Sequence, residues 1–367
     1  MTEREVLLKI EDLKLNFHTY RGEVKALNGA DLTVYRGEVL SLVGESGCGK
    51  STAAHAILRL LPDNAYILGG RIIFRGEDLL KKSGAEIREI RAKQIAMIFQ
   101  DPMTYLNPVL TAGTQLREVF DLNEDFLKQE TILSLENPGR KPDYDIYLTT
   151  RTSGETAQDA RVSKGDLKAT ANRLSRDFLT LTQLPDPERI MTQYPHELSG
   201  GMRQRVMIAM ALARRPYLLI ADEITSALDV TVQAQILQFL KALRDKTDAA
   251  ILFITHDLSV AAELSDRIAV MYGGSVVEVA PTAELFQRPL HPYTQLLQKS
   301  IPDVRKVEKR LDSIPGFVPD MISPPSGCRF HPRCPYAREK CHLEKPPMIE
   351  VEKGRFVACY NYEVEAS

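Results

Sequence analysis

The chain has 367 residues, a length that suggests two or three domains, and its 44% hydrophobic and 26% charged content predicts a packed globular core. Its formal net charge of −2 provides no basic field for nucleic acid, so we expect no nucleic-acid partner. The sequence contains no apolar run of about 18 residues that would span a bilayer, and no apolar h-region follows Met1. We therefore expect a cytoplasmic protein whose connection to a membrane comes through a partner.

The first hundred residues predict strands around one helix. Residues 7–17 alternate apolar and polar side chains, which predicts a strand with one buried face. The short apolar run at 38–43 predicts a buried strand that leads into glycines, and 50–61 predicts a helix with one apolar face, ended by Pro62. Further strands are predicted at 71–74 and 95–99.

From about residue 109 to 195 the pattern is helical, with an apolar stripe at Leu167, Ala171, Leu174, Phe178 and Leu181. The polar stretch at 136–166 predicts a loop or small excursion. A helix at 200–212 and strands at 217–221, 250–254 and 268–272 complete an α/β pattern with a largely parallel sheet. Beyond residue 301 the chain is rich in proline and has no periodicity, so something other than regular packing must hold this segment, or it is disordered.

A glycine loop fits the phosphate-binding pattern G-x-x-x-x-G-K-[ST]. Its glycines let backbone N–H groups turn inward around phosphate oxygens, and the predicted strand before it and helix after it favour this interpretation over an ordinary glycine turn. Lys50 supplies a cation for the β- and γ-phosphates, and Ser51 supplies a hydroxyl for Mg²⁺. The nucleotide-binding candidates are Gly44, Glu45, Ser46, Gly47, Cys48, Gly49, Lys50, Ser51 and Thr52.

The apolar strand near residue 220 delivers two carboxylates, Asp222 and Glu223. Asp222 is placed to hold Mg²⁺ through water, and Glu223 to polarise the attacking water as a general base. A solvated acidic pair at a strand end is the alternative, but the phosphate loop in the same chain favours a catalytic pair.

Ser199, Gly200 and Gly201 open a predicted helix. The two glycines leave N–H groups available at the positive helix end and Ser199 adds a hydroxyl, which together make a second anion site. Lys50 already binds the γ-phosphate of the ATP on its own chain. This second anion site therefore requires the γ-phosphate of another ATP, bound to a second domain of the same kind. A glycine N-cap without further function is the alternative.

These motifs resemble the nucleotide-binding subunits of ABC transporters, and most of all the oligopeptide/dipeptide import branch. The resemblance is carried by GESGCGKST at 44–52, FQDPMTYLNP at 99–108, YPHELSGGMRQR at 194–205, LLIADEITSALD at 218–229 and FITHDL at 253–258, with PGFVPDM at 315–321 and four cysteines in the tail. It implies an α/β P-loop ATPase domain at 1–300, with a mixed sheet core, an antiparallel β subdomain and a helical subdomain at about 105–215. An irregular Cys/Pro-rich extension at 301–367 follows.

The resemblance also implies roles for single residues. Gln100 would touch Mg²⁺, together with Ser51 and Asp222, and report the nucleotide state to the membrane subunit. His256 would contact the γ-phosphate and Asp229 would lie in the loop that crosses the dimer interface. Tyr20, with Phe17 as its rival, would stack on adenine.

Two departures from the family pattern stand out. Ile224 occupies the place where the family usually has proline after the catalytic glutamate, and we expect little effect on the chemistry. The segment at about 121–185 is longer than expected for the helical subdomain, and an added contact surface is one explanation.

Four of the five cysteines, Cys328, Cys334, Cys341 and Cys359, lie near the end of the chain. In a reducing cytosol such a cluster predicts a metal or iron–sulfur site before disulfides. Its spacing lacks the close pairs typical of zinc, so an iron–sulfur cluster is favoured, and the resemblance points to [4Fe–4S]. Zinc, with His331 or His342 as further ligands, and unliganded or oxidised thiols are the alternatives. The fifth, Cys48, fits the phosphate loop by its small size; a redox brake on ATP binding has no support.

The resemblance predicts an ATPase subunit that powers import of di- or oligopeptides by ATP-driven closure of two such domains. One alternative is the same role in an oligosaccharide or nickel importer. The other is a soluble ABC ATPase that takes no part in transport. The expected partners are a second ATPase subunit, identical or paralogous, two transmembrane permease subunits and an extracytoplasmic binding protein. The chain would then lie peripherally on the cytoplasmic side of the membrane. A tail that senses redox state is a further hypothesis.

Overall fold

The structure, a computed structural model, describes residues 4–99, 105–136, 162–224, 230–246, 248–301 and 314–362. The chain forms two compact units, residues 1–83 with 252–367 and residues 84–251. The division falls inside strand β8 (Ala250–Thr255). The phosphate loop and the cysteine tail therefore belong to the first unit, and the Asp222–Glu223 pair belongs to the second.

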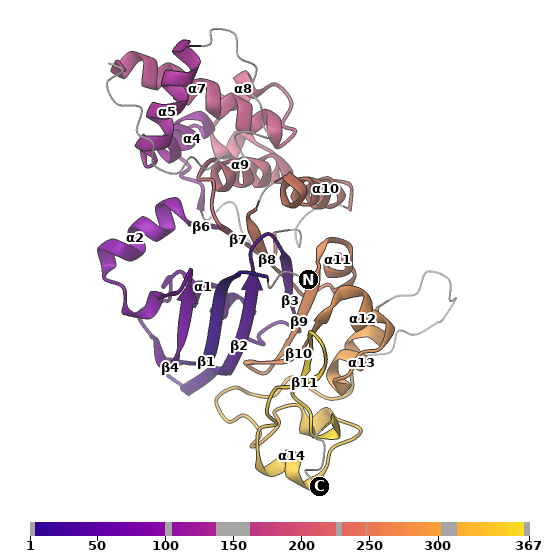
Figure 1. Cartoon of the computed structure of the whole chain (residues 1–367). Coiled ribbons are helices and arrows are strands. Elements are labelled where there is room, and N and C mark those ends of the chain that lie inside the picture. The colour runs from indigo at the N-terminus through magenta and orange to yellow at the C-terminus, as the bar shows by residue number, and fades with distance from the viewer. Residues whose placement is uncertain are drawn as a thin grey trace. The chain divides into compact units, whose positions relative to one another are not determined.

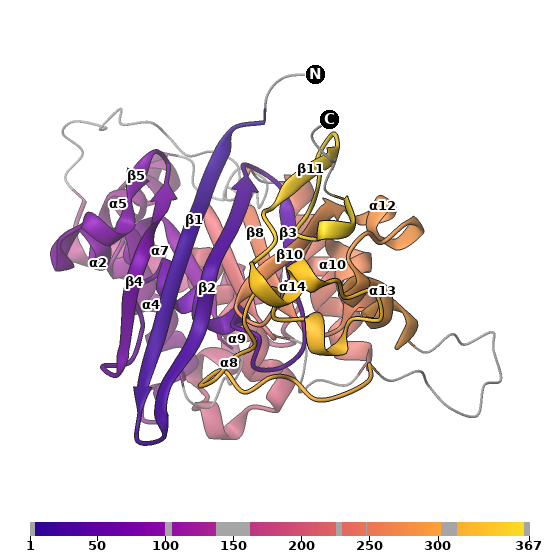
Figure 2. The ribbon, with the colours of Figure 1, turned by 90° about the horizontal axis from the view of Figure 1, so that it is seen from below.

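An antiparallel sheet forms one part of the first unit (Figures 1 and 2). Its order is β2-β1-β4-β5, with β1 at Val6–Thr19, β2 at Gly22–Tyr35, β4 at Ala65–Phe74 and β5 at Glu77–Asp78. The predicted alternation in β1 changes phase between Ile10 and Leu13, which are both buried. The register shifts there, and Asp12 has a positive φ of 45°, so a β-bulge returns the apolar residues to the same face.

A mixed sheet forms the other part of the first unit. Its strands follow the order β11-β12-β10-β9-β3-β8, with β3 at Val39–Val43, β9 at Arg267–Tyr272, β10 at Ser275–Pro281, β11 at Ile349–Glu352 and β12 at Arg355–Val357. β3 is parallel to β9, whereas β10 and the two tail strands pair antiparallel. The β9–β10 hairpin and the tail extend the sheet in the antiparallel sense, so the sheet is mixed, as the family resemblance implies. All five residues of β3 are buried, as its apolar run predicts.

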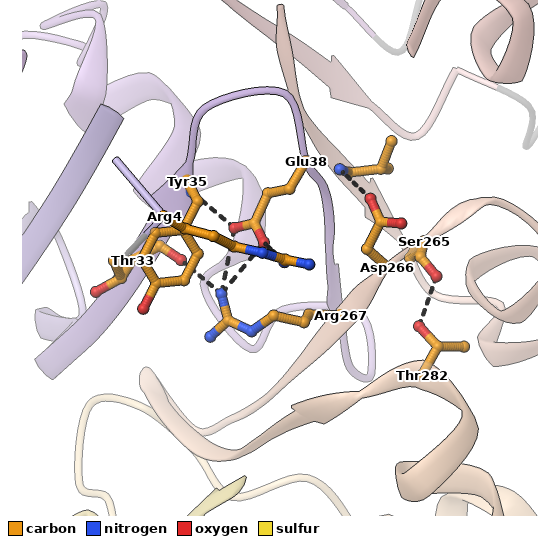
Figure 3. A network of polar contacts seen from close by, with 9 residues as sticks. Arg4, Thr33, Tyr35, Glu38, Ser265, Asp266, Arg267 and Thr282 are labelled. Atoms are coloured by element: carbon orange, nitrogen blue, oxygen red, sulfur yellow. Dashed lines mark hydrogen bonds and ion pairs between the residues drawn. The ribbon is translucent and has the colours of Figure 1, made fainter. Parts of the chain in front are cut away.

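Buried polar groups fix β3 beside β9 (Figure 3). Glu38 accepts from the backbone N–H of Tyr35 at 2.7 Å and from Nη1 of Arg267 at 3.2 Å. Asp266 accepts from the N–H of Val39 at 2.9 Å. Burial raises the pKa of the Glu38 carboxyl, and the charge of Arg267 opposes this rise. These contacts hold the strand that delivers the phosphate loop.

Short helices complete the first unit (Figure 1). They are α1 (Lys50–Ile57), α11 (Leu258–Leu264), α12 (Thr282–Gln287), α13 (Pro292–Lys299) and α14 (Glu339–Leu343), with 3-10 turns at Leu79–Lys81, His331–Arg333 and Tyr360–Tyr362. α1 ends four residues before the predicted Leu61, because Arg59 adopts a left-handed φ of 50°.

The proline-rich tail at 314–362 contributes side chains to the core, although it lacks the periodicity that predicts burial. Phe330 joins the apolar core with Tyr272 and Tyr293, at ring-centroid distances of 5.0 and 5.4 Å. Three tail arginines, Arg329, Arg333 and Arg355, are also buried. Aromatic packing and buried guanidinium groups thus hold a segment that the sequence suggested would need another support.

The second unit is mainly helical. Its elements are α2 (Gly84–Lys93), β6 (Ile95–Ile98), α4 (Ala112–Asp121), α5 (Glu124–Glu136), α7 (Lys164–Leu181), α8 (Pro187–Thr192), a 3-10 turn at Pro195–Glu197, α9 (Gly200–Ala213), β7 (Leu218–Asp222) and α10 (Val230–Lys246). Ser163 and Asp166 form a capping box at the start of α7. The predicted stripe is buried at Ala171, Leu174 and Phe178. No helix in the described ranges is long and apolar enough to cross a bilayer. Most of the predicted loop at 136–166 lies outside the described residues.

Candidate functional site

The loop at 44–52 connects β3 to α1, as its motif predicts. Gly44 lies so close to β9 that a Cβ there would meet the carbonyl oxygen of Met271 at 2.2 Å. Gly47 and Gly49 have φ values of 80° and 105°, which side chains other than glycine rarely adopt. Gly49 is the N-cap of α1, so the loop presents backbone N–H groups at a helix start.

Lys50 is nearly buried, with 4% of its surface exposed. Its ammonium donates to the carbonyl oxygens of Gly44 at 2.8 Å and Glu45 at 3.2 Å. The cation is therefore held against the loop it follows, where arriving phosphates would meet it. Ser51 and Thr52 follow half-buried in the first turn of α1, while Ser46 is exposed.

Glu45 is fixed through both its backbone and its side chain. Its N–H donates to the phenol oxygen of Tyr293 at 2.9 Å, and its carboxylate accepts from Nη1 and Nη2 of Arg333 at 2.7 and 3.1 Å. Burial lowers the pKa of the Arg333 guanidinium, but the hydrogen bonds to Glu45 and Tyr272 outweigh it and raise the pKa overall. A residue of the tail thus forms a bidentate ion pair with the phosphate loop.

Cys48 is 1% exposed, and burial raises the pKa of its thiol to about 11. Its carbonyl oxygen accepts from the N–H of Gly274 at 2.9 Å. A buried, protonated thiol is a poor nucleophile. That Cys48 is present for its small size stays a prediction.

His256 and Tyr20 are the other candidates of the first unit. His256 is exposed and follows β8, which neighbours β3 in the sheet. Tyr20 lies in the turn between β1 and β2 with 98% of its surface exposed, whereas its rival Phe17 is half-buried. An exposed ring at a turn is available for stacking on a flat base.

Asp222 and Glu223 lie in the second unit. Asp222 is the last residue of β7 and is buried, and Glu223 follows half-buried with a left-handed φ of 47°. Such a backbone is costly for a residue with a side chain and clusters at functional sites. β6 runs parallel to β7, with Ile98 paired to Ala221, so the chain leaves both strands at the same edge. Gln100, just beyond β6, and Asp229 lie outside the described residues.

The glycine pair at 200–201 opens α9 as predicted. Ser199 is the N-cap, and its hydroxyl accepts from the N–H of Met202 at 3.3 Å. Ser199 and Gly200 are exposed, so the start of this 14-residue helix faces solvent. A Cβ on Gly201 would approach Val232 to 3.2 Å. The positive helix end is open to an anion.

The four tail cysteines line one pocket, together with His291, Phe330 and His331 among others. Burial, with smaller contributions from the charges of neighbouring cysteines, raises the pKa of Cys328 and Cys359 to about 11. Within the described ranges, no three His, Cys, Asp or Glu side chains converge as a single metal ion requires. His331 and His342 face one another at 4.1 Å between ring centroids.

Sequence reasoning missed Arg333 and Tyr293 as partners of the loop. Neither belongs to a recognised motif, and they lie 288 and 248 positions from Glu45. Arg333 stands among other basic residues, Arg329, His331 and Arg338, so nothing in the local sequence marks it.

Comparison with known proteins agrees with this arrangement. The ABC transporter family profile matches residues 27–226, and the profile of the oligopeptide/dipeptide transporter C-terminal region matches residues 277–341. The "Probable peptide ABC transporter ATP-binding protein" of Sinorhizobium fredii is 44% identical over 97% of this chain and 95% of its own. The oligopeptide transport ATP-binding protein OppD of Bacillus subtilis is 42% identical over 96% of this chain and 87% of its own.

A solved structure shows the same fold for the cassette. A dimeric ATP-binding cassette in a post-hydrolysis state with ADP and Pi matches with a TM-score of 0.56 and 25% identity, over 75% of this chain and 99% of its own. P-loop ATPases use a loop of this kind and a carboxylate at the end of a strand to hold phosphates and Mg²⁺. The chain therefore belongs to the ATP-binding proteins of ABC transporters and is an ATPase coupled to transport.

Proposed function

We propose that this chain powers import of di- or oligopeptides by ATP-driven closure of two ATPase subunits. The observation that carries the proposal is the loop at 44–52, in which left-handed glycines and the buried Lys50 form a phosphate cradle at the start of α1. The peptide substrate is supported by similarity to peptide and dipeptide transport proteins over more than 95% of the chain.

The loop at 44–52, the start of α1 and Tyr20 would bind ATP. The backbone of Gly44 to Gly49 and the α1 N-terminus would hold the phosphates, Lys50 would exchange its two carbonyl partners for phosphate oxygens, and Tyr20 would stack on adenine. Mg²⁺ would be held by Ser51, Asp222 and Gln100, hydroxyl, carboxylate and amide oxygens that suit this hard cation. Bound Mg²⁺ would neutralise negative charge on the phosphates.

Glu223 would act as the general base in hydrolysis, and His256 would contact the γ-phosphate. Glu223 accepts a proton from water as the water oxygen attacks phosphorus, and the bond to the β-phosphate oxygen breaks to leave ADP. Glu223 directly follows β7, and its left-handed backbone conformation sets the direction in which its side chain leaves the strand end. Ile224, which stands in place of the family's proline, is buried and takes no part in this chemistry.

The exposed start of α9 is assigned to the ATP of the other subunit. Ser199, Gly200 and Gly201 would donate to the γ-phosphate held there, while Asp229 would cross the interface. Because ATP binds more tightly to the closed pair, it shifts the population toward closure, and hydrolysis reopens it. A dimeric cassette with ADP and Pi is among the similar solved structures.

The remaining assignments follow from membership of the family. We place the chain on the cytoplasmic side of the membrane, with a second identical or paralogous ATPase, two permease subunits and an extracytoplasmic binding protein. We assign residues 1–300 to the ABC domain, with its helical subdomain at about 105–215. Residues 301–367 form the extension.

We further assign a [4Fe–4S] cluster to the four tail cysteines. The four cysteines line one pocket and interact electrostatically with one another, which fits a group that takes four thiolates. The role assigned is structural, since such a group ties together a segment with few regular elements.

Identifying the ligand of the binding protein tests the peptide assignment. The native complex is purified from membranes and the molecules retained by its binding protein are identified by mass spectrometry. Di- or oligopeptides are expected. A sugar or a nickel complex would reassign the substrate, and purification with nucleic acid and no permease would overturn transport.

A further inference from the structure

The cysteine tail contacts the phosphate loop at one residue, Glu45. Arg333, which directly precedes Cys334, is 8% exposed and places both terminal nitrogens on the Glu45 carboxylate. Its Nε donates to the carbonyl oxygen of Pro315 at 2.9 Å, and Nη1 also reaches the Tyr272 hydroxyl at 3.3 Å. The guanidinium is thus held by the tail and by Tyr272 as well as by the loop.

A second path joins the same two segments. Phe330 packs against Tyr293, and the hydroxyl of Tyr293 accepts from the N–H of Glu45. Phe330, Arg333 and Cys334 share the 3-10 turn at His331–Arg333, where the N–H of Arg333 donates to Phe330 and that of Cys334 to His331. One turn of the tail therefore restrains both the backbone and the side chain of Glu45.

Glu45 is also a partner of Lys50. The carbonyl oxygen of Glu45 accepts from the Lys50 ammonium at 3.2 Å and from the N–H of Cys48 at 3.3 Å. Fixing Glu45 thus fixes the peptide against which Lys50 rests. A loop that is ordered before its ligand arrives loses less conformational entropy on binding, and the ligand binds more tightly.

We propose that Arg333 is a positioning residue for nucleotide binding, through which the cysteine tail holds the phosphate loop in its binding conformation. The proposal rests on the assigned role of the loop at 44–52. Arg333 does not touch the nucleotide and acts through Glu45. Because such coupling is reciprocal, bound nucleotide also stabilises the turn that carries Cys334.

The test is a double-mutant cycle on ADP affinity, measured by calorimetry on the purified chain. ADP reports on the phosphate loop without closure of the ATPase pair. Arg333→Gln and Glu45→Gln should each weaken ADP binding by roughly five- to fiftyfold, and the double variant should bind no more weakly than the weaker single. In the assembled transporter, Arg333→Lys should raise KM for ATP and leave kcat unchanged, because binding is lost equally in ground and transition states.

Arg355→Lys is the matched control. Arg355 is a tail arginine with 2% exposure that contacts Glu284, Glu352 and the carbonyl oxygen of Arg288, none of which belongs to the loop at 44–52. It should cost stability without changing ADP affinity. If Arg333→Gln does not fold, Arg333→Lys replaces it in the cycle, since lysine keeps the charge and loses the bidentate geometry.

Additive effects of the Arg333 and Glu45 changes, or an unchanged ADP affinity, would overturn the proposal. Lys50→Ala separates this failure from failure of the assigned site. If Lys50→Ala abolishes ADP binding while the cycle is additive, only the role of Arg333 is lost. If Lys50→Ala binds ADP normally, the assignment of the loop itself falls.

Discussion

The carboxylate of Glu45 accepts two hydrogen bonds from the guanidinium of Arg333, at 2.7 and 3.1 Å, across 288 positions of the chain. The pair joins the first functional motif of the sequence to its last recognisable segment. It lies within one compact unit, together with the aromatic core of Tyr272, Tyr293 and Phe330. The tail is therefore packed against the loop at 44–52 within this unit.

Because Phe330 is packed in the core, we expect Phe330→Ala to destabilise the folded chain strongly. Phe330 is 1% exposed and touches two buried tyrosines, so its truncation should lower the free energy of unfolding by about 3–5 kcal/mol. Phe317→Ala is the control, because Phe317 is 94% exposed and should cost less than about 0.5 kcal/mol. Denaturant unfolding of both variants measures the difference; equal effects would contradict the packing described for the tail.

Burial of His291 predicts an acid-sensitive contribution to stability. Burial lowers the pKa of His291 from 6.5 to about 3, so the folded chain keeps this ring neutral while the unfolded chain takes up a proton below 6.5. The free energy of unfolding is therefore unaffected by this group above pH 6.5. It falls by about 1.4 kcal/mol per pH unit as the pH drops from 6.5 toward 3.

His291→Asn isolates this effect. The ring Nδ1 of His291 accepts from the N–H of Tyr293 at 3.0 Å as the N-cap of α13, and asparagine keeps such a cap without titrating. Unfolding at pH 7.5 and pH 5.5 should show a smaller loss of stability for the variant than for the parent chain. Identical losses would show that His291 is charged, or equally accessible, in the folded state.

The buried thiol of Cys48 predicts slow alkylation. With a pKa of about 11 and 1% exposure, Cys48 carries almost no thiolate near neutral pH. Mass spectrometry after iodoacetamide treatment at pH 8 should find it unmodified in the folded chain and fully modified after unfolding. Rapid labelling of the folded chain would revive the hypothesis of a redox brake at this loop.

The tail cysteines predict bound iron. Protein purified without oxygen should be brown and contain about four irons per chain, and Cys328→Ser should lose both colour and iron together with thermal stability. Cys48→Ser is the matched control and should retain the iron. Colourless, iron-free protein with one bound zinc would replace the cluster by the zinc alternative.

The sequence indicates the local parts of the site well and their long-range partners poorly. Gly44 to Lys50 and Ser199 to Gly201 lie at a strand–helix junction and a helix start because glycine and N-cap preferences act over a few residues. The bulge at Asp12 and the early end of α1 at Arg59 depend on left-handed backbone that no local motif announces. Arg333 could not be recognised, because a salt bridge leaves no period in the sequence and its partner is 288 positions away.

Glu223→Gln tests the central claim, that Glu223 drives an ATP cycle which powers peptide uptake. The amide keeps the shape of the side chain but cannot accept the proton of water, so phosphate release should fall by about 10²–10⁴-fold while ATP still binds and closes the ATPase pair. The measurement is ATP-dependent uptake of a labelled dipeptide by vesicles that contain the complete transporter. The account predicts uptake by the parent complex and none by the variant; uptake by the variant at a rate near that of the parent would contradict it.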